Sequence, residues 1–376
     1  MRIGVPRETW PGEMRAALVP AGIKKLKQLG FDVVVQSGVG AGPRIFDEDY
    51  REAGAAIGAD VAQTTADADI VLRVRKPRTD DVGLLKTGAV HVSFLDPFNE
   101  KDLVRALAQR GVTAISMEMI PRTTRAQKMD ALSSQASLAG YVTVLLGASK
   151  APRVLPMMMT PAGTISPSRV FIIGAGVAGL QAIATAKRLG ARVEAFDTRP
   201  VVAEQVESLG AKFLRIDLGE TGQTAQGYAR ELTPEQLALQ REGMKRTISQ
   251  SDIVITTAQV FGRPAPRIVS ADMVQAMRPG SVIVDMAIES GGNVEGAKLD
   301  QVVDVNGVSI VGFGNLPSQV SRNASEMYSA NLVNLLGDFW KADKKELALD
   351  PADDIVKGCV ITRGGEVVNE TIRKLL

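Results

Sequence analysis

The strongest constraint on the fold is a glycine motif near the middle of the chain. Four apolar residues, 170–173, run directly into Gly174-x-Gly176-x-x-Gly179, and an alanine-rich helical segment follows as far as Gly190. This order predicts a buried parallel strand, a tight turn and a helix N-terminus. Gly174 would allow the turn, Gly176 the approach of a pyrophosphate, and Gly179 close packing of helix against strand. The free N–H groups of the helix would then face the phosphates.

A second predicted strand places an acidic residue where a dinucleotide site requires one. The segment 192–196 is followed by Asp197, about 20 residues beyond the glycines, where a carboxylate accepts the two ribose hydroxyls. Asp197 favours NAD over NADP because its charge would repel a 2′-phosphate, although the positive charge of Arg199 works against this preference. The alternative is a glycine-rich strand–helix turn with an ordinary capping aspartate.

Length and composition indicate two domains of ordinary size. A chain of 376 residues exceeds a single core, and 44 Lys and Arg nearly balance 42 Asp and Glu, which favours neither nucleic acid nor anionic lipid as a partner. A single cysteine, Cys359, and a single histidine, His91, cannot supply a disulfide or a zinc site, so no metal is predicted. No signal-peptide pattern opens the chain. The longest apolar stretch, 170–186, belongs to the glycine motif, so we expect no direct membrane insertion.

Strand and helix patterns alternate through most of the chain, which predicts an α/β fold with doubly wound parallel sheets. We expect two Rossmann-like domains with a cleft between them. The first covers 1–132 and is completed by 318–376, and the second, a dinucleotide-binding domain, covers 133–317. A linking helix is expected from 131 to about 149. The tail, 347–376, contains a predicted short strand at 358–362, a Gly364-Gly365 turn and a charged end, and we expect it to pack poorly, as a contact arm would.

Two polar segments contain fewer apolar residues than the sequence around them. The first, 121–135, interleaves Arg, Gln, Asp and Ser directly before the expected linking helix. It is either a loop that reaches into the interdomain cleft or a helix entrance capped by Asp130, and spacing alone does not decide between them. The second, between Asp217 and Glu235, suits a mobile flap as well as a plain surface excursion.

Three stretches of the sequence carry a resemblance to a known family. Residues 122–135, 156–163 and 174–187 resemble the NAD(H)-binding domain I of proton-translocating NAD(P) transhydrogenase in its separate-subunit form, and the likeness covers nearly the whole chain. The resemblance implies hydride transfer from NADH to NADP+ held on a partner subunit that binds NADP(H). It also implies a separate membrane subunit for proton translocation, a homodimer, and a peripheral position at the cytoplasmic face of the inner membrane.

The resemblance also implies the residues of the site. Four would surround the nicotinamide end of NAD(H): Arg122, Gln127, Asp130 and Ser133. Others would bind the rest of the cofactor, with 227–228 on a loop that closes over it: Gly174, Gly176, Val177, Gly179, Asp197, Thr198, Arg199, Gly227, Tyr228 and Gln259. A non-catalytic NAD-sensing module is an alternative, but sensing does not require such polar residues beside the reactive ring.

Alanine dehydrogenase is the nearer alternative. Arg15 matches the arginine that holds the substrate carboxylate in that enzyme, but the other matches fail. Arg75 stands at its substrate lysine, Asp96 at its catalytic histidine, and Glu289 at its aspartate before Gly-Gly. Oxidising an amine requires a proton acceptor with a pKa near neutral. Direct hydride transfer between two nicotinamides requires no proton acceptor, so these substitutions favour transhydrogenation.

Overall fold

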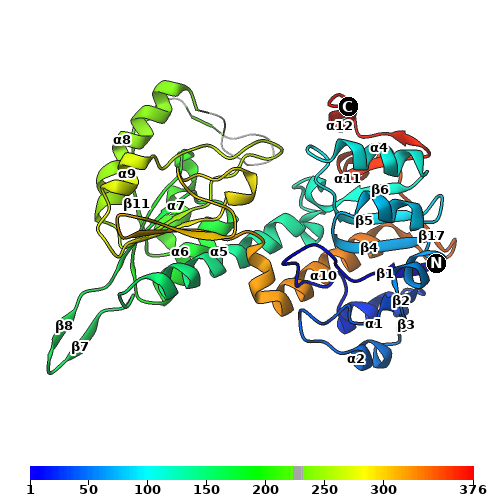
Figure 1. The fold of residues 1–376 in the computed structure, drawn as a ribbon. Helices are drawn as coiled ribbons and strands as arrows, with labels where there is room; N and C mark the ends of the chain where they lie inside the picture. The colour runs from blue at the N-terminus through cyan, green and yellow to red at the C-terminus, as the bar shows by residue number, and fades with distance from the viewer. Residues whose placement is uncertain (220, 223–229, 231) are drawn as a thin grey trace. The chain divides into compact units, whose positions relative to one another are not determined.

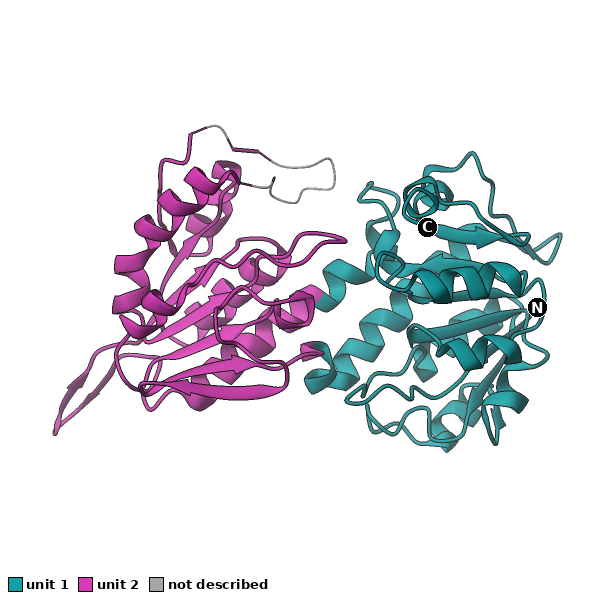
Figure 2. Cartoon of the chain, turned by 45° about the horizontal axis from the view of Figure 1, so that its top comes forward, with its two compact units in different colours: residues 1–135, 317–376 teal, residues 136–316 magenta. Residues whose placement is uncertain are grey.

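Two separate sheets organise the chain. The computed structural model describes residues 1–219, 221–222, 230 and 232–376. Unit 1 comprises Met1–Gln135 and Pro317–Leu376, and unit 2 comprises Ala136–Leu316 (Figure 2). Each unit contains one large, mostly parallel sheet flanked by helices (Figure 1). The prediction of an α/β fold with two Rossmann-like sheets is therefore confirmed.

The sheet of unit 1 has the strand order β19-β18-β6-β5-β4-β1-β2-β3. The strand order reverses between β1 and β4, which is the position where open α/β sheets form a crevice at the carboxyl ends of the strands. The strands are β1 (Arg2–Val5), β2 (Asp32–Gln36), β3 (Ala56–Gly58), β4 (Ile70–Arg75), β5 (Val90–Phe94), β6 (Thr113–Ser116), β18 (Val360–Arg363) and β19 (Glu366–Val367). The helices are α1 (Pro20–Gln28), α2 (Asp47–Glu52), α3 (Val61–Thr65), α4 (Lys101–Gln109), α10 (Ser321–Phe339), α11 (Asp354–Cys359) and α12 (Glu370–Arg373).

The sheet of unit 2 has the order β11-β10-β9-β12-β13-β15-β14 and reverses between β9 and β12. All its neighbours are parallel except the antiparallel pair of β14 with β15. The strands are β9 (Arg169–Ile173), β10 (Arg192–Phe196), β11 (Lys212–Phe213), β12 (Ile253–Thr256), β13 (Val282–Asp285), β14 (Gln301–Val305) and β15 (Val308–Gly312). The helices are α6 (Val177–Arg188), α7 (Ala203–Ser208), α8 (Pro234–Gln250) and α9 (Ala271–Gln275). A separate hairpin of β7 (Met158–Thr160) and β8 (Gly163–Ile165) extends away from this sheet (Figure 1).

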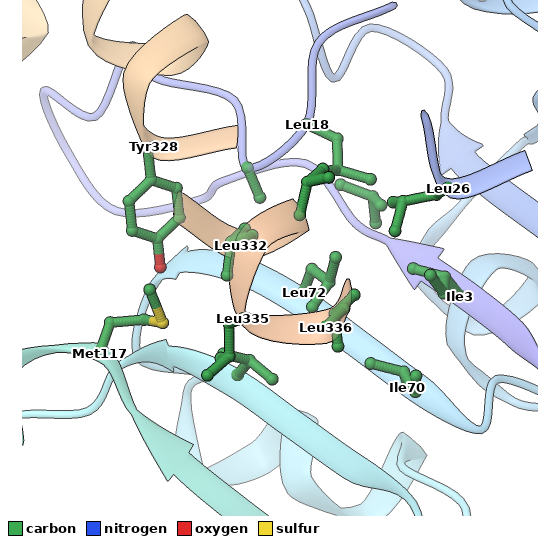
Figure 3. Close-up of a cluster of buried hydrophobic side chains, with 14 of the residues drawn as sticks. Ile3, Leu18, Leu26, Ile70, Leu72, Met117, Tyr328, Leu332, Leu335 and Leu336 are labelled. Carbon is green, nitrogen blue, oxygen red and sulfur yellow. The ribbon is translucent and has the colours of Figure 1, made fainter. Parts of the chain in front are cut away.

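The helix α10 forms the centre of the core of unit 1. Tyr328, Leu332, Leu335 and Leu336 on α10 lie among apolar side chains of β1, β4 and α1 (Figure 3). All four are at most 1% exposed. The buried hydroxyl of Tyr328 donates to the carbonyl oxygen of Arg73 at 2.9 Å, so its polar atom is satisfied inside the core. This helix therefore covers strands that lie more than two hundred residues earlier in the chain.

The C-terminal tail corrects a sequence prediction. We expected 347–376 to pack poorly, but β18 pairs antiparallel with β6 and extends the sheet of unit 1. Cys359 and Ile361 are 1% and 0% exposed, and Ile372 on α12 is also fully buried. A short hairpin of β16 (Trp340–Lys341) and β17 (Glu346–Leu347) leads into this segment. The prediction was wrong because apolar residues of the tail, among them Ile361 and Ile372, pack in one core cluster with Ala114 of β6, and β18 covers the edge of that strand.

The helix α5 (Ala131–Lys150) confirms the predicted linking helix and is more apolar than expected. By length and composition it is the one helix among the described residues that is suitable for a membrane span, and 44% of its apolar window is buried in the protein. The prediction of this helix did not include its apolar character, because 170–186 was identified as the longest apolar stretch. Val142 and Val144 are 2% and 1% exposed, as in the core helix of a globular domain, which has the same composition.

A buried ion pair attaches the N-terminal segment of unit 1 to the start of α5. Arg15 donates to both carboxylate oxygens of Glu13, at 2.8 and 2.6 Å, and to the side-chain oxygen of Gln135 at 2.9 Å. Ser318 also donates to Glu13, at 2.8 Å. Burial alone would raise the pKa of the Glu13 carboxyl, but the hydrogen bonds and charge of Arg15 outweigh it and lower the pKa to about 2.

We predict that Ile361→Ala lowers the free energy of unfolding by about 2–5 kcal/mol, because it leaves a cavity under the β6–β18 pair. Urea denaturation measures this difference. Val368→Ala is the control, since Val368 is 39% exposed and its loss should cost less than about 0.5 kcal/mol. Equal unfolding curves for Ile361→Ala and the unmodified chain would mean that the tail does not contribute to the core.

We also predict a specific acid sensitivity. Because the pKa of Glu13 is about 2 in the folded protein and near 4.5 otherwise, its stabilising effect is complete above pH 4.5 and is lost as the pH falls towards 2. The contribution is on the order of 3 kcal/mol. In urea denaturation between pH 5 and 2.5, Glu13→Gln should show a shallower loss of stability than the unmodified chain. Asp343→Asn, at an exposed position, should retain the original slope, and identical slopes for all three proteins would contradict the prediction.

Candidate functional site

The glycine turn of unit 2 has the geometry that the motif predicts. β9 ends at Ile173, and Gly174 follows with φ 99°, a conformation that side chains other than hydrogen strongly disfavour. The N–H of Gly174 donates to the carbonyl oxygen of Phe196 at 2.8 Å, so the turn lies beside the end of β10. A Cβ on Gly179 would overlap the carbonyl oxygen of Gly174. The first turn of α6 therefore packs directly against the end of β9.

The N-terminus of α6 is open. Gly176 is the N-cap, no side chain caps it, and a Cβ placed there would meet no atom within 4 Å. Val177, the first helical residue, is 39% exposed. The first N–H groups of a helix have no partner within it, and they carry the positive end of the helix dipole. A 12-residue helix with this uncapped entrance fits a phosphate group approaching Gly176.

Both oxygens of the Asp197 carboxylate accept hydrogen bonds within the protein, which the spacing of the motif did not indicate. One oxygen accepts from the backbone N–H and the Nε of Arg199, at 2.9 and 2.8 Å. The other accepts from the N–H of Ala175 at 2.7 Å and from Nη2 of Arg199 at 2.8 Å. These four bonds occupy the acceptor sites of a carboxylate, and Asp197 is only 9% exposed. The ribose contact expected of Asp197 therefore requires Arg199 to give up hydrogen bonds.

The remaining predicted residues of unit 2 have different environments. The carbonyl oxygen of Thr198 accepts a hydrogen bond from the hydroxyl of Thr221 at 2.7 Å. Gln259 is exposed just beyond β12, the strand next to β9, and so lies at the carboxyl edge of the sheet. Gly227 and Tyr228 lie outside the described residues.

Sequence reasoning missed a buried network that holds the segment before Gln259. Asn293 is 0% exposed, and its side chain accepts from the N–H and donates to the carbonyl oxygen of Ala258, at 3.1 and 2.8 Å. Asp285 in turn accepts from the N–H of Asn293 at 2.8 Å, and burial raises the pKa of this carboxyl. Thr257 donates to the carbonyl oxygen of Gly174 at 3.2 Å. The only sequence signal was an acidic residue that ends a predicted strand, followed by Gly-Gly-Asn.

The other four predicted residues lie together in unit 1, at the entrance to α5. Asp130 accepts from the N–H and the hydroxyl of Ser133, at 2.9 and 2.6 Å, which caps the helix. Nε of Arg122 is 3.9 Å from the Asp130 carboxylate. Gln127 is exposed, and no hydrogen bond within the described chain involves its side-chain amide. The helix-cap interpretation of Asp130 is therefore correct as local structure, and it leaves Gln127 available to a ligand.

Two of the positions that distinguish alanine dehydrogenase, Arg75 and Asp96, form ion pairs. The Asp96 carboxylate accepts hydrogen bonds from Nζ of Lys76 at 3.1 Å and from the side-chain amide of Asn99 at 2.7 Å. Its φ is 53°, and its N–H donates to Glu118. Nε of Arg75 contacts Glu13 at 3.2 Å. A surface pocket of about 450 Å³ between α1 and α10 contains none of the predicted site residues.

Comparisons with known proteins identify the family. The chain matches the models described as alanine dehydrogenase/PNT, N-terminal domain, over 4–139 and C-terminal domain over 143–370. It is 45% identical to a Rhodospirillum rubrum protein named as the first portion of NAD(P) transhydrogenase subunit alpha, with 99% of each chain covered. A solved transhydrogenase from Sinorhizobium meliloti matches with a TM-score of 0.89 and 45% identity, over 98% of this chain and 100% of the other. A solved L-alanine dehydrogenase matches with a TM-score of 0.82 and 26% identity, over 100% of this chain and 99% of the other. This chain belongs to the alanine dehydrogenase/PNT family.

Proposed function

We infer that this chain is the NAD(H)-binding alpha subunit of an NAD(P) transhydrogenase. The observation that carries this conclusion is the 45% identity to a protein of that name over 99% of both chains, against 26% to the solved L-alanine dehydrogenase. The engagement of Asp96 with Lys76 and Asn99 agrees with it, because a carboxylate held as a hydrogen-bond acceptor is a poor substitute for a catalytic histidine.

NAD(H) binding belongs to unit 2. The turn at Gly174–Gly179 and the uncapped start of α6 fit a pyrophosphate, and Asp197 at the end of β10 is the partner for the adenosine ribose. Thr198, Arg199 and Gln259 lie at or near the same edge of the sheet. This arrangement supplies binding that is equal in the ground and transition states.

The reaction is direct hydride transfer. When bound, the dihydronicotinamide ring supplies a hydride, which carries two electrons to NADP+ on the partner subunit, so NADH becomes NAD+ and NADP+ becomes NADPH. No proton acceptor is needed. Arg122, Gln127, Asp130 and Ser133 orient the carboxamide and the nearby ribose. Their contribution is geometric, because the reacting carbons must come within roughly 3–3.5 Å.

The partners are an NADP(H)-binding subunit and a membrane subunit that couples hydride transfer to proton translocation. Through them this chain is peripheral at the cytoplasmic face of the inner membrane. The chain itself forms a homodimer. The hairpin β7–β8 supports the homodimer, since Met157, Met159 and Ile165 are 59%, 75% and 46% exposed, and a two-stranded hairpin is marginally stable alone.

We predict that the chain, mixed with its NADP(H)-binding partner subunit, transfers hydride from NADH to NADP+, and that Gln127→Asn slows this step far more than it weakens NADH binding. The shorter side chain displaces the amide by about one bond length, and a misplacement of about 1 Å can cost on the order of a hundredfold in rate. Single-turnover hydride transfer and equilibrium NADH binding, measured on the same variant, test this expectation.

Three outcomes decide against this interpretation. If transfer by Gln127→Asn is unchanged, or falls only in step with NADH affinity, then 121–135 serves only as a capped helix entrance. Robust reduction of NAD+ with alanine as substrate would favour the alanine dehydrogenase alternative. Tight NADH binding without transfer in the presence of the partner subunit would favour the sensing module.

We predict that the unmodified chain binds NADH much more tightly than NADPH, and that Asp197→Ala weakens NADH binding by roughly 1–3 kcal/mol. Isothermal titration with each nucleotide measures both. Arg199→Ala is the matched control, because it removes the two guanidinium bonds to Asp197 and leaves those from the N–H groups of Ala175 and residue 199 in place, which opens two acceptor positions to the ribose. This variant should bind NADH at least as tightly as the unmodified chain. If both variants lose NADH affinity equally, the Asp197–Arg199 ion pair contributes to binding and not a carboxylate free to bind the ribose, and equal affinity for NADH and NADPH would refute the ribose contact.

A further inference from the structure

The segment Arg125–Met129 is held to α10 and to the C-terminal tail by contacts that the proposed mechanism does not use. Ala126 and Met129 are both 0% exposed and belong to the core of unit 1. Between them, Gln127 and Lys128 are exposed. Gln127 therefore stands between two buried anchors, and the backbone on either side of it is fixed by packing.

Arg125 makes the strongest of these contacts. Its Nε and Nη2 donate to one oxygen of Asp338 at 2.9 and 2.6 Å, and its Nη1 donates to Asp353 at 2.6 Å. Its guanidinium also lies 5.3 Å from the ring centre of Phe339. A single exposed ion pair contributes little, but a guanidinium shared by two carboxylates forms a network with a defined geometry.

Lys128 is held through both its side chain and its backbone. Its Nζ is 2.9 Å from the second oxygen of Asp338. Its carbonyl oxygen accepts from the side-chain amides of Asn331 and Asn334, both at 3.1 Å. Asn331 also accepts from the hydroxyl of Ser134 at 2.8 Å, which connects the loop to the first turn of α5.

The three residues on α10 form one polar face. Asn331, Asn334 and Asp338 are spaced by three and four positions, which places them on the same side of a helix. The adjacent side of α10 is fixed in the core by Tyr328, Leu332 and Leu336 (Figure 3). The loop is therefore attached to an element that cannot shift without opening the core of unit 1.

We propose that Asn331, Asn334, Asp338 and Asp353 are positioning residues for hydride transfer, which hold 125–129 so that Gln127 keeps its place beside the nicotinamide. This inference rests on the proposed function. The four residues act on the site through Arg125 and Lys128 rather than by touching the cofactor. Asp353 extends this role to the C-terminal tail, since the same side chain accepts from the N–H of Ile355 at 2.8 Å and caps α11.

The test uses Asp338→Asn and Asn334→Ala in the full chain, mixed with the NADP(H)-binding partner subunit. Neither position is in the core, so both variants should fold; near-ultraviolet circular dichroism checks this. We expect single-turnover hydride transfer to fall about tenfold or more in each, because small displacements of an orienting group cost rate. NADH affinity should stay within about twofold, because the pyrophosphate and ribose contacts are unchanged. Hydrogen exchange should speed up at the amides of Gln127 and Met129.

Two further variants make the experiment specific. Asp338→Glu keeps the charge that faces Arg125 and Lys128 and should recover much of the rate lost in Asp338→Asn. Glu326→Gln removes an exposed ion pair with Arg322 on the same helix, at 3.5 Å, and should leave both rate and affinity unchanged. A contact that only stabilises the fold would lower the melting temperature of Asp338→Asn without changing the rate well below that temperature.

The outcomes separate this inference from the function on which it rests. An unmodified chain that transfers no hydride with the partner would overturn the proposed function. If the unmodified chain transfers hydride, and Asp338→Asn and Asn334→Ala match it or lose rate only in step with NADH affinity, the positioning role is wrong while the function stands.

Discussion

The burial of one side of α10 is the interaction on which unit 1 depends. Its apolar side covers β1 and β4, and its serines also accept from the N-terminal segment: Ser325 from the N–H of Ala16 at 2.9 Å and Ser329 from that of Val19 at 3.3 Å. Its polar side holds the loop before α5. One helix thus joins the first residues of the chain, the loop with four candidate site residues, and the C-terminal tail into a single unit.

Much of the architecture could be predicted from the sequence because the signals were local. Short apolar runs predict the strands 253–256 and 282–285. The glycines after β9 predict the turn, because its backbone geometry requires glycine. β14 was not recognised in this way, and in the tail the strand at 358–362 was predicted but its packing was not. Val302 on β14 is 42% exposed, so its strand has no clear apolar pattern, and β18 packs against β6, a strand that is far from it in the sequence.

The candidate site was predictable in its residue types but not in its hydrogen bonds. Spacing placed Asp197 at the end of β10, yet nothing in the spacing indicates that Arg199 and Ala175 occupy its carboxylate. Similarly, Asp130 could be interpreted as a cap or as a ligand-binding group from the sequence, and the structure shows how its carboxylate is bound to Ser133. Partners distant in sequence, such as Asn331 and Lys128, depend on tertiary packing, which a single sequence does not encode locally.

The return of the chain through α10 has a consequence during synthesis. Unit 2 is a continuous segment, whereas unit 1 lacks both α10 and β18 until the ribosome has passed Arg363. At about 5–20 residues per second, roughly 10–45 s separate the emergence of Gln135 from that of β18. During this interval β6 is an uncovered edge strand and the apolar face of its sheet is open to water. Once Leu316 has emerged, the nascent chain has an unfinished first unit attached to a complete second one, and a chaperone that covers the open edge of β6 would act at this stage.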